Sequence, residues 1–459
     1  MPLAEGPVPK RGLPRALQAH LQALKTRRAG ATAALLAVAT SVLILALNLA
    51  TGILTARYLG PTGRGELAAI IMWPQIFAFA LTLGLPSSLL YNLKCFPDRE
   101  SPLFSSTLLL GSAMGGLAVI LGILLVPAWL IEYSPETVRW AQWGMLAAPI
   151  ALFHVILISA MLAREEFGLY NFARAVPPLL AMFLLVILVL AGRLTSFSAA
   201  VATLVSPAPA CLWMTWRLWR AYRPRLQELT TSSKLLLSYG LRSYGVDLLG
   251  TLTNQADRLI VVGFLDPGMM GLYVVAMNLS QVLNTFPTAV VSVLFPKASG
   301  RPGKEVVALT GRAVRVSLSC TALLATIGTM LGPYVLERLY GPEFLPAVAV
   351  MRILLIEATL RGAIWILAQA FMAMGSPGLV TLFQGVGLAL SVPLLLWLVP
   401  VYGLVGAGYA LLIATAARLV MVLVCFPLVL NHAPPRLLLG WTEIAALLSR
   451  GEGSDKQTT

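Results

Sequence analysis

The sequence predicts an all-α polytopic membrane protein with twelve transmembrane helices. Of the 459 residues, 58% are hydrophobic and 11% are charged, whereas a soluble domain carries about 25% charged residues. Apolar stretches recur along the chain, and a stretch of about 20 apolar residues spans the ~30 Å hydrocarbon core as a helix. Only helices and closed barrels satisfy their backbone polar groups in that environment. The predicted spans are 31–56, 66–92, 104–130, 140–163, 173–191, 197–216, 238–265, 270–296, 314–336, 346–372, 378–399 and 403–430.

The spans fall into two sets of six that look like copies of one unit. Shifting the chain by 206 residues, the difference between positions 61 and 267, places the first span on the seventh. Pro61 then falls on Pro267, and Gly65 falls on Gly271. Because each set has an even number of spans, both sets enter the membrane from the same side, which is a parallel repeat about an axis along the membrane normal. We expect two six-helix lobes related by a pseudo-two-fold axis around a central cavity.

The predicted domain organisation follows from the spans and from the longest internal connection between them. That connection is basic and ends in a polar run, so we interpret it as a linker between the lobes. The expected segments are a basic tail at 1–30, an N-lobe at 31–216, a linker at 217–237, a C-lobe at 238–430 and a second tail at 431–459.

The distribution of basic residues predicts the topology. With the amino terminus in the cytosol, the cytosolic segments hold 23 Lys and Arg residues and the outer loops hold five. This excess is the positive-inside bias, and it predicts that both termini are cytosolic. The net charge of +14 then serves topology and contact with anionic headgroups, so no nucleic-acid partner is expected. The five outer residues are Arg57, Arg64, Arg139, Arg193 and Arg338.

Charged residues inside the predicted spans mark the candidate site, because each costs about 2.5–3.5 kcal/mol at bilayer depth. In the seventh span, Asp247, Asn254 and Arg258 share one helical face with Thr251. We expect three arginines to converge near the midplane of the C-lobe: Arg258, Arg361 and Arg418. The residues expected to line the same cavity are Asp247, Asn254, Asn278, Gln281 and Gln369. Three carboxylates are candidates for ion or proton coupling: Asp247, Asp257 and Glu357.

Arginine at these positions favours an anionic substrate. Its guanidinium stays charged and presents a planar fork that matches phosphate oxygens. A structural alternative stays open for two of the three residues. Arg361 can pair with Glu357 one helical turn away, and Arg258 can pair with Asp257, Asp247 or a carboxylate on a neighbouring helix. The sequence shows no metal-ligand spacing, and we expect no catalytic residues, metal or cofactor.

Short motifs in order along residues 31–430 resemble polysaccharide (Wzx-like) flippases of the multidrug/oligosaccharidyl-lipid/polysaccharide exporter superfamily. They are Ala56–Pro61 (ARYLGP), Leu83–Pro86 (LGLP), Asp257–Leu259 (DRL) followed by Gly271–Tyr273 (GLY), Phe295–Ser299 (FPKAS), Tyr340–Phe344 (YGPEF) and Tyr402–Ala407 (YGLVGA). The resemblance implies a V-shaped, two-lobed fold. It also implies movement of a polyprenyl-diphosphate-linked oligosaccharide to the outer leaflet of a bacterial inner membrane. A polysaccharide polymerase and a chain-length regulator are the partners that it suggests, and we expect a monomer in contact with membrane lipids.

The sequence therefore predicts a flippase that works by alternating access and is not an enzyme. Two alternatives share the expected fold: a cation-coupled, multidrug-type exporter of small molecules and a lipid II-type flippase. A membrane enzyme that polymerises or ligates glycans is disfavoured, because the outer loops are too short to hold a catalytic site.

Overall fold

The computed structural model describes residues 15–225 and 228–437, and these residues form helices and connections without a strand. Short 3₁₀ or π turns join several of the helices, and the longest of these are Leu336–Tyr340 and Pro342–Ala347. The α-helices are α1 (Arg15–Ala80), α2 (Leu85–Cys95), α3 (Glu100–Trp129), α4 (Pro135–Gly144), α5 (Ala148–Ala163), α6 (Phe167–Leu190), α7 (Ser196–Val205), α8 (Ala208–Tyr222), α9 (Leu229–Phe264), α10 (Pro267–Gln281), α11 (Thr285–Ala298), α12 (Gly303–Val335), α13 (Val348–Ala373) and α14 (Pro377–Leu430).

Eight helical segments of the described chain are long and apolar enough to cross a membrane. The α9 and α13 helices, which carry Arg258 and Arg361, are not among the eight. Two of the eight, α1 and α14, each contain two helices that meet at a single non-helical glycine, Gly60 or Gly403. The chain is thus an all-α, multi-pass membrane protein, as the composition predicts. Two of the turns expected between spans are therefore sharp kinks instead of loops.

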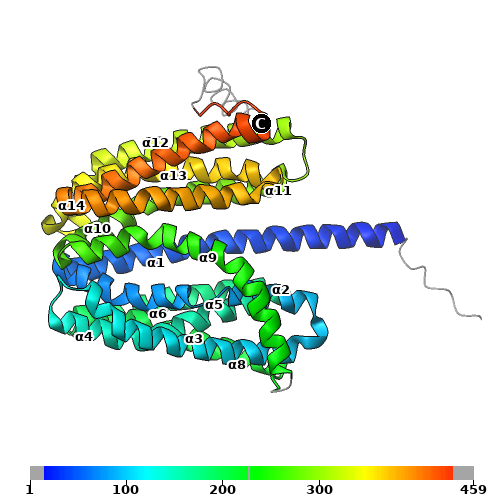
Figure 1. Cartoon of the computed structure of the whole chain (residues 1–459), viewed down its shortest axis with the longest axis horizontal. Coiled ribbons are helices and arrows are strands. Elements are labelled where there is room, and N and C mark those ends of the chain that lie inside the picture. The colour runs from blue at the N-terminus through cyan, green and yellow to red at the C-terminus, as the bar shows by residue number, and fades with distance from the viewer. Residues whose placement is uncertain (1–14, 226–227, 438–459) are drawn as a thin grey trace, which may run out of the picture.

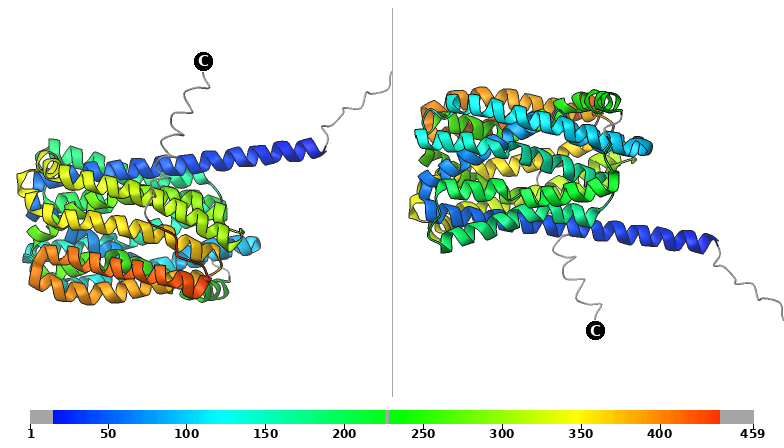
Figure 2. Two further views of the ribbon diagram at one scale, coloured as in Figure 1. Left: turned by 90° about the horizontal axis from the view of Figure 1, so that it is seen from above. Right: turned by 90° about the horizontal axis from the view of Figure 1, so that it is seen from below.

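The helices of the two halves of the chain gather on opposite sides of the molecule (Figure 1). Helices α2 to α8 lie on one side and α11 to α14 on the other, with α1, α9 and α10 between them. One core cluster belongs to the first half together with Leu236 of α9, and another belongs to the second half. A third cluster spans both halves, where α1 packs along α10. The amino-terminal part of α1 extends beyond the other helices (Figure 2).

Four of the breaks between helices fall inside predicted spans and lie close to prolines. Helix α1 ends at Ala80 shortly before Pro86, and 3₁₀ turns precede Pro149 and Pro287. The fourth break separates α7 from α8 at Pro207. Proline has no N–H to donate and its ring clashes with the preceding turn, so the helix is interrupted on the amino-terminal side of each proline.

The segment expected as a linker, 217–237, contains the end of one helix and the start of the next. Helix α8 continues to Tyr222, and α9 begins at Leu229. The start of α9 packs on α2 and α3 of the first half. The Ser88 hydroxyl donates to the Leu236 carbonyl over 2.7 Å, and the Ser106 hydroxyl donates to the Leu229 carbonyl over 3.2 Å. These hydrogen bonds join the start of α9 to the first half of the chain.

The two halves also meet at the other end of the molecule through a reciprocal backbone contact. A methyl group added to Gly65 would overlap the Pro267 carbonyl and lie 2.9 Å from the Gly271 nitrogen. A methyl group added to Gly271 would overlap the Pro61 carbonyl and lie 3.1 Å from the Gly65 nitrogen. Each side of this contact presents a proline carbonyl and a glycine nitrogen to the glycine of the other side. We call these four residues the glycine contact.

The Gly65→Ala substitution is expected to lower stability, because the new methyl group overlaps a carbonyl that belongs to packed backbone. Overpacking of this kind costs about 1–3 kcal/mol. Thermal unfolding of the purified protein in detergent measures the effect. The matched control is Gly116→Ala in α3, where an added methyl group meets nothing within 4 Å. Equal melting temperatures for Gly65→Ala and the parent chain would contradict the close contact.

Candidate functional site

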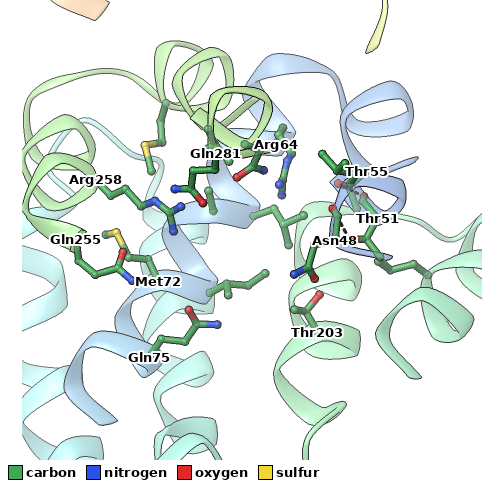
Figure 3. Close-up of a pocket in the computed structure, with 18 of the residues that line it drawn as sticks. Asn48, Thr51, Thr55, Arg64, Met72, Gln75, Thr203, Gln255, Arg258 and Gln281 are labelled. Atoms are coloured by element: carbon green, nitrogen blue, oxygen red, sulfur yellow. Dashed lines mark hydrogen bonds between the residues drawn. The ribbon is translucent and has the colours of Figure 1, made fainter. Parts of the chain in front are cut away.

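A central cavity of about 360 Å³ lies between helices of the two halves. Its walls come from α1, α6 and α7 on one side and from α9 and α10 on the other. Figure 3 shows polar side chains from these helices directed toward the same space. The polar residues that line it are Asn48, Thr51, Thr55, Arg64, Gln75, Thr203, Gln255, Arg258, Asn278 and Gln281.

Two arginines line this cavity without a carboxylate partner in the described part of the chain. Arg64 follows the kink at Gly60 in α1, and its buried Nε has no hydrogen-bond partner among the described residues. Arg258 lies on α9, and its Nε approaches the Met277 sulfur at 3.5 Å. No ion pair of either arginine occurs among the described residues. Because both guanidinium groups keep their positive charge, the cavity holds two positive charges that no described carboxylate balances.

The position of Arg64 corrects its assignment to an outer loop. The backbone leaves helical geometry at Gly60 alone and is helical again at Arg64. The side chain therefore projects from a helix into the cavity. The repeat contains a signal for this placement, because Arg64 aligns with Met270, which also lines the cavity.

Asp257 does not pair with its neighbour Arg258. The Tyr273 hydroxyl donates to the buried Asp257 carboxylate over 2.6 Å. Consecutive residues of a helix point in directions about 100° apart, so α9 presents Arg258 to the central cavity while Asp257 lines a second one.

The second cavity, of about 400 Å³, lies within the second half between α9, α13 and α14. In it, Arg361 Nη2 lies 3.1 Å from Glu357 Oε2, and the Thr415 hydroxyl donates to Glu357 Oε1 over 2.8 Å. Arg418 has no ion pair among the described residues, and its Nε is buried without a partner there. Gly387 leaves room for this arginine, since a methyl group at that position would lie 3.0 Å from Arg418 Cδ.

The expected site residues are thus divided between two cavities. Arg258, Asn278 and Gln281 line the central cavity. Five others line the cavity of the second half: Arg361, Arg418, Gln369, Asp257 and Glu357. The three arginines do not share one cavity, because the rotation of each helix about its own axis turns them to different sides. The side chains of Asp247 and Asn254 lie outside the described residues.

Sequence reasoning assigned no site role to several residues of the central cavity. Besides Arg64, these include Gln255, whose buried Oε1 has no partner among the described residues. Asn48 and Gln75 stand out in the sequence as polar groups in apolar spans, which is the signal that could have assigned them.

Comparison with solved structures shows a shared fold. A structure described as "Lipid II flippase MurJ, inward closed conformation" matches with a TM-score of 0.74 at 14% identity, covering 87% of this chain and 88% of that chain. An inward-facing multidrug resistance MATE family transporter of the MOP superfamily matches with a TM-score of 0.65 at 15% identity, covering 82% and 93%. A MOP superfamily transporter from Pyrococcus furiosus matches with a TM-score of 0.59 at 14% identity, covering 84% and 92%. At these identities the likeness shows the fold alone.

Comparison with protein families identifies a family of polysaccharide biosynthesis proteins, in agreement with the resemblance of the motifs. A search of curated protein sequences finds no match. A family profile described as "Polysaccharide biosynthesis protein" matches residues 54–349, which is well over half of the chain. The matched region includes α9 and α10 and most of the residues that line the central cavity. The chain belongs to the polysaccharide biosynthesis protein family and has the fold of MOP-superfamily transporters.

Proposed function

We propose that this protein is a flippase that moves a polyprenyl-diphosphate-linked oligosaccharide across the bacterial inner membrane by alternating access. In this proposal the chain has twelve spans in two lobes, and both termini lie in the cytosol. The observation that carries it is the central cavity, where Arg64 and Arg258 lie without carboxylate partners among amides and hydroxyls in the described chain.

The chemistry of the cavity suits the two polar parts of such a substrate. A glycan and a diphosphate cannot cross hydrocarbon unaided, because burying unpaired polar or charged groups is costly. Arg64 and Arg258 would bind the diphosphate through charge-assisted hydrogen bonds. The amides of Asn278 and Gln281 would hydrogen-bond the sugar hydroxyls. The polyprenyl tail would stay in lipid between the lobes.

The glycine contact supports the two-lobed arrangement with a pseudo-two-fold axis. The four residues that form it are related by the same shift of 206 positions that aligns the two sets of spans. It lies at the end of the molecule opposite the α8–α9 connection, which the positive-inside bias assigns to the cytosol. Alternating access would require this contact to separate when the cavity opens to the outside.

The cavity of the second half would serve energy coupling or the binding of a second part of the substrate. Asp257 and Glu357 line it and are the carboxylates that we propose for ion or proton coupling, together with Asp247. Arg418, which has no ion pair among the described residues, would bind an anionic group of the substrate there, as would Arg361 and Gln369.

A lipid II-type flippase is the second candidate, favoured by the likeness in fold to MurJ. Both candidates carry a glycan on a polyprenyl diphosphate, so the arginine cavity supports either. The third candidate is a cation-coupled, multidrug-type exporter of small molecules. The arginines of the cavity disfavour this candidate for cationic cargo, because they would repel a cation. The partners that we propose, a polysaccharide polymerase and a chain-length regulator, follow from the family alone.

The Arg64→Gln and Arg258→Gln substitutions are each expected to slow flipping by about 10- to 100-fold. A hydrogen bond to a charged group contributes about 1.5–3 kcal/mol, and every 1.4 kcal/mol is about tenfold. The rate is measured in proteoliposomes with a fluorescent polyprenyl-diphosphate oligosaccharide that is quenched from outside. Arg193→Gln is the matched control, because Arg193 is exposed and lines neither cavity. Wild-type rates in both cavity variants would reject the proposed diphosphate site.

A substitution of Arg418 tests the second cavity independently of the central one. Arg418→Gln is expected to impair flipping without lowering the amount of folded protein, since no carboxylate of the described chain is left unpaired by its loss. Flipping rate and yield after size-exclusion chromatography are the two readouts. Full activity in this variant would remove Arg418 from the proposed substrate contacts.

The Glu357–Arg361 pair is expected to contribute to stability whatever its role in transport. Glu357→Ala should destabilise the protein by about 3–5 kcal/mol, because it leaves a partly buried guanidinium without its partner. The double variant Glu357→Ala/Arg361→Ala should recover part of this loss. Thermal unfolding of Glu357→Ala, Arg361→Ala and the double variant gives the coupling energy between the two side chains. Additive losses would show that the two side chains do not interact.

A further inference from the structure

An apolar groove between α11 and α12 lies apart from both polar cavities. None of its lining residues lines either of them. On α11, the lining residues recur at helical spacing and form one stripe from Phe286 to Lys297. On α12, Leu309, Ala313 and Val316 form the facing stripe. A groove of this composition on a membrane helix pair suits a hydrocarbon chain.

Two cations line the same groove. Lys297 is the penultimate residue of α11, and Arg312 projects from the first third of α12. Both are exposed, and neither has an ion pair among the described residues. By contrast, Arg301 in the connection between the two helices pairs with Glu305 at 3.2 Å. The groove therefore combines an apolar surface with two positive charges that no described carboxylate balances.

The two charges and the apolar stripe occupy positions along the helices that suit the headgroup and the acyl chain of a lipid. The α11–α12 connection belongs to the set of segments that the positive-inside bias assigns to the cytosol. Lys297 lies beside that connection, while Phe286 lies eleven residues away, toward the other end of α11. Basic pockets between membrane helices on the cytosolic side bind anionic headgroups. We propose that this groove is a binding site for an anionic phospholipid of the cytosolic leaflet, with its phosphate between Lys297 and Arg312 and an acyl chain along the apolar stripe.

The proposal goes beyond transport, because it assigns a resident lipid outside the transport cavity. Only the choice of leaflet rests on the proposed topology. A bound anionic lipid would join α11 to α12 at the membrane surface, where α12 extends past the apolar part of its span. Because Lys297 and Arg312 make no ion pair with described residues, the phosphate would be their counter-charge.

The test is native mass spectrometry of the full chain in detergent. The delipidated protein is titrated with phosphatidylglycerol or with phosphatidylcholine of the same acyl chains. The parent chain is expected to retain phosphatidylglycerol in preference. The double variant Lys297→Gln/Arg312→Gln is expected to bind phosphatidylglycerol about thirty-fold more weakly, since each cation near the surface contributes about 1 kcal/mol. The matched control is Lys304→Gln, because Lys304 is an exposed cation of the same region that does not line the groove.

A second variant tests the apolar stripe with the charges intact. Val293 is 52% exposed in the groove, so Val293→Trp should fill the groove without disturbing the core and should also weaken phosphatidylglycerol binding. Equal retention of the two lipids, or equal losses in the double variant and in Lys304→Gln, would overturn the proposal. Retention of a polyprenyl diphosphate in the groove in place of phospholipid would overturn it too, by making the groove part of the substrate path. Flipping rates are measured on the same variants. A failure of this lipid proposal can then be told apart from a failure of the proposed diphosphate site at Arg64 and Arg258.

Discussion

An unpaired guanidinium in hydrocarbon is so unfavourable that each arginine of the spans needs a partner or a polar cavity. Arg361 has a partner, because it forms an ion pair with Glu357. The Thr415 hydroxyl donates a hydrogen bond to the same carboxylate. Arg64 and Arg258 instead both face the polar cavity between the halves. An arginine that is already paired offers less to a substrate than one without a carboxylate. The two cavities therefore differ in chemistry even though each contains two arginines.

Helix α9 links the two cavities because it contributes a charge of opposite sign to each. Arg258 lines the central cavity, while Asp257 lines the other and is held there by the Tyr273 hydroxyl. The first turns of the same helix pack on α2 and α3 of the other half. A rotation or tilt of α9 would displace both charges together and would strain its contacts with both halves.

The sequence was sufficient for features that depend on local pattern. The all-α class follows from the length of the apolar runs, and the family follows from motifs such as Asp257–Leu259 that are continuous in the chain. The division of the arginines between cavities could not be predicted, because it depends on how packing rotates each helix. Arg64 was missed for a related reason: the turn after the first span reads as a loop. The backbone dihedrals of the structure show that the chain bends at Gly60 and continues as a helix.

The glycine contact brings the backbones of the two halves close together after the bend at Gly60. With no side chain on Gly65 or Gly271, backbone approaches backbone directly, as small residues allow at helix interfaces in membranes. Such a contact has no interlocked side chains, so its two surfaces can separate and meet again without a change of rotamer. Interdigitated side chains at the same place would resist separation, since packed interfaces deform poorly. A contact between backbones, such as the one at Gly65 and Gly271, therefore separates more readily than a tightly packed apolar core would.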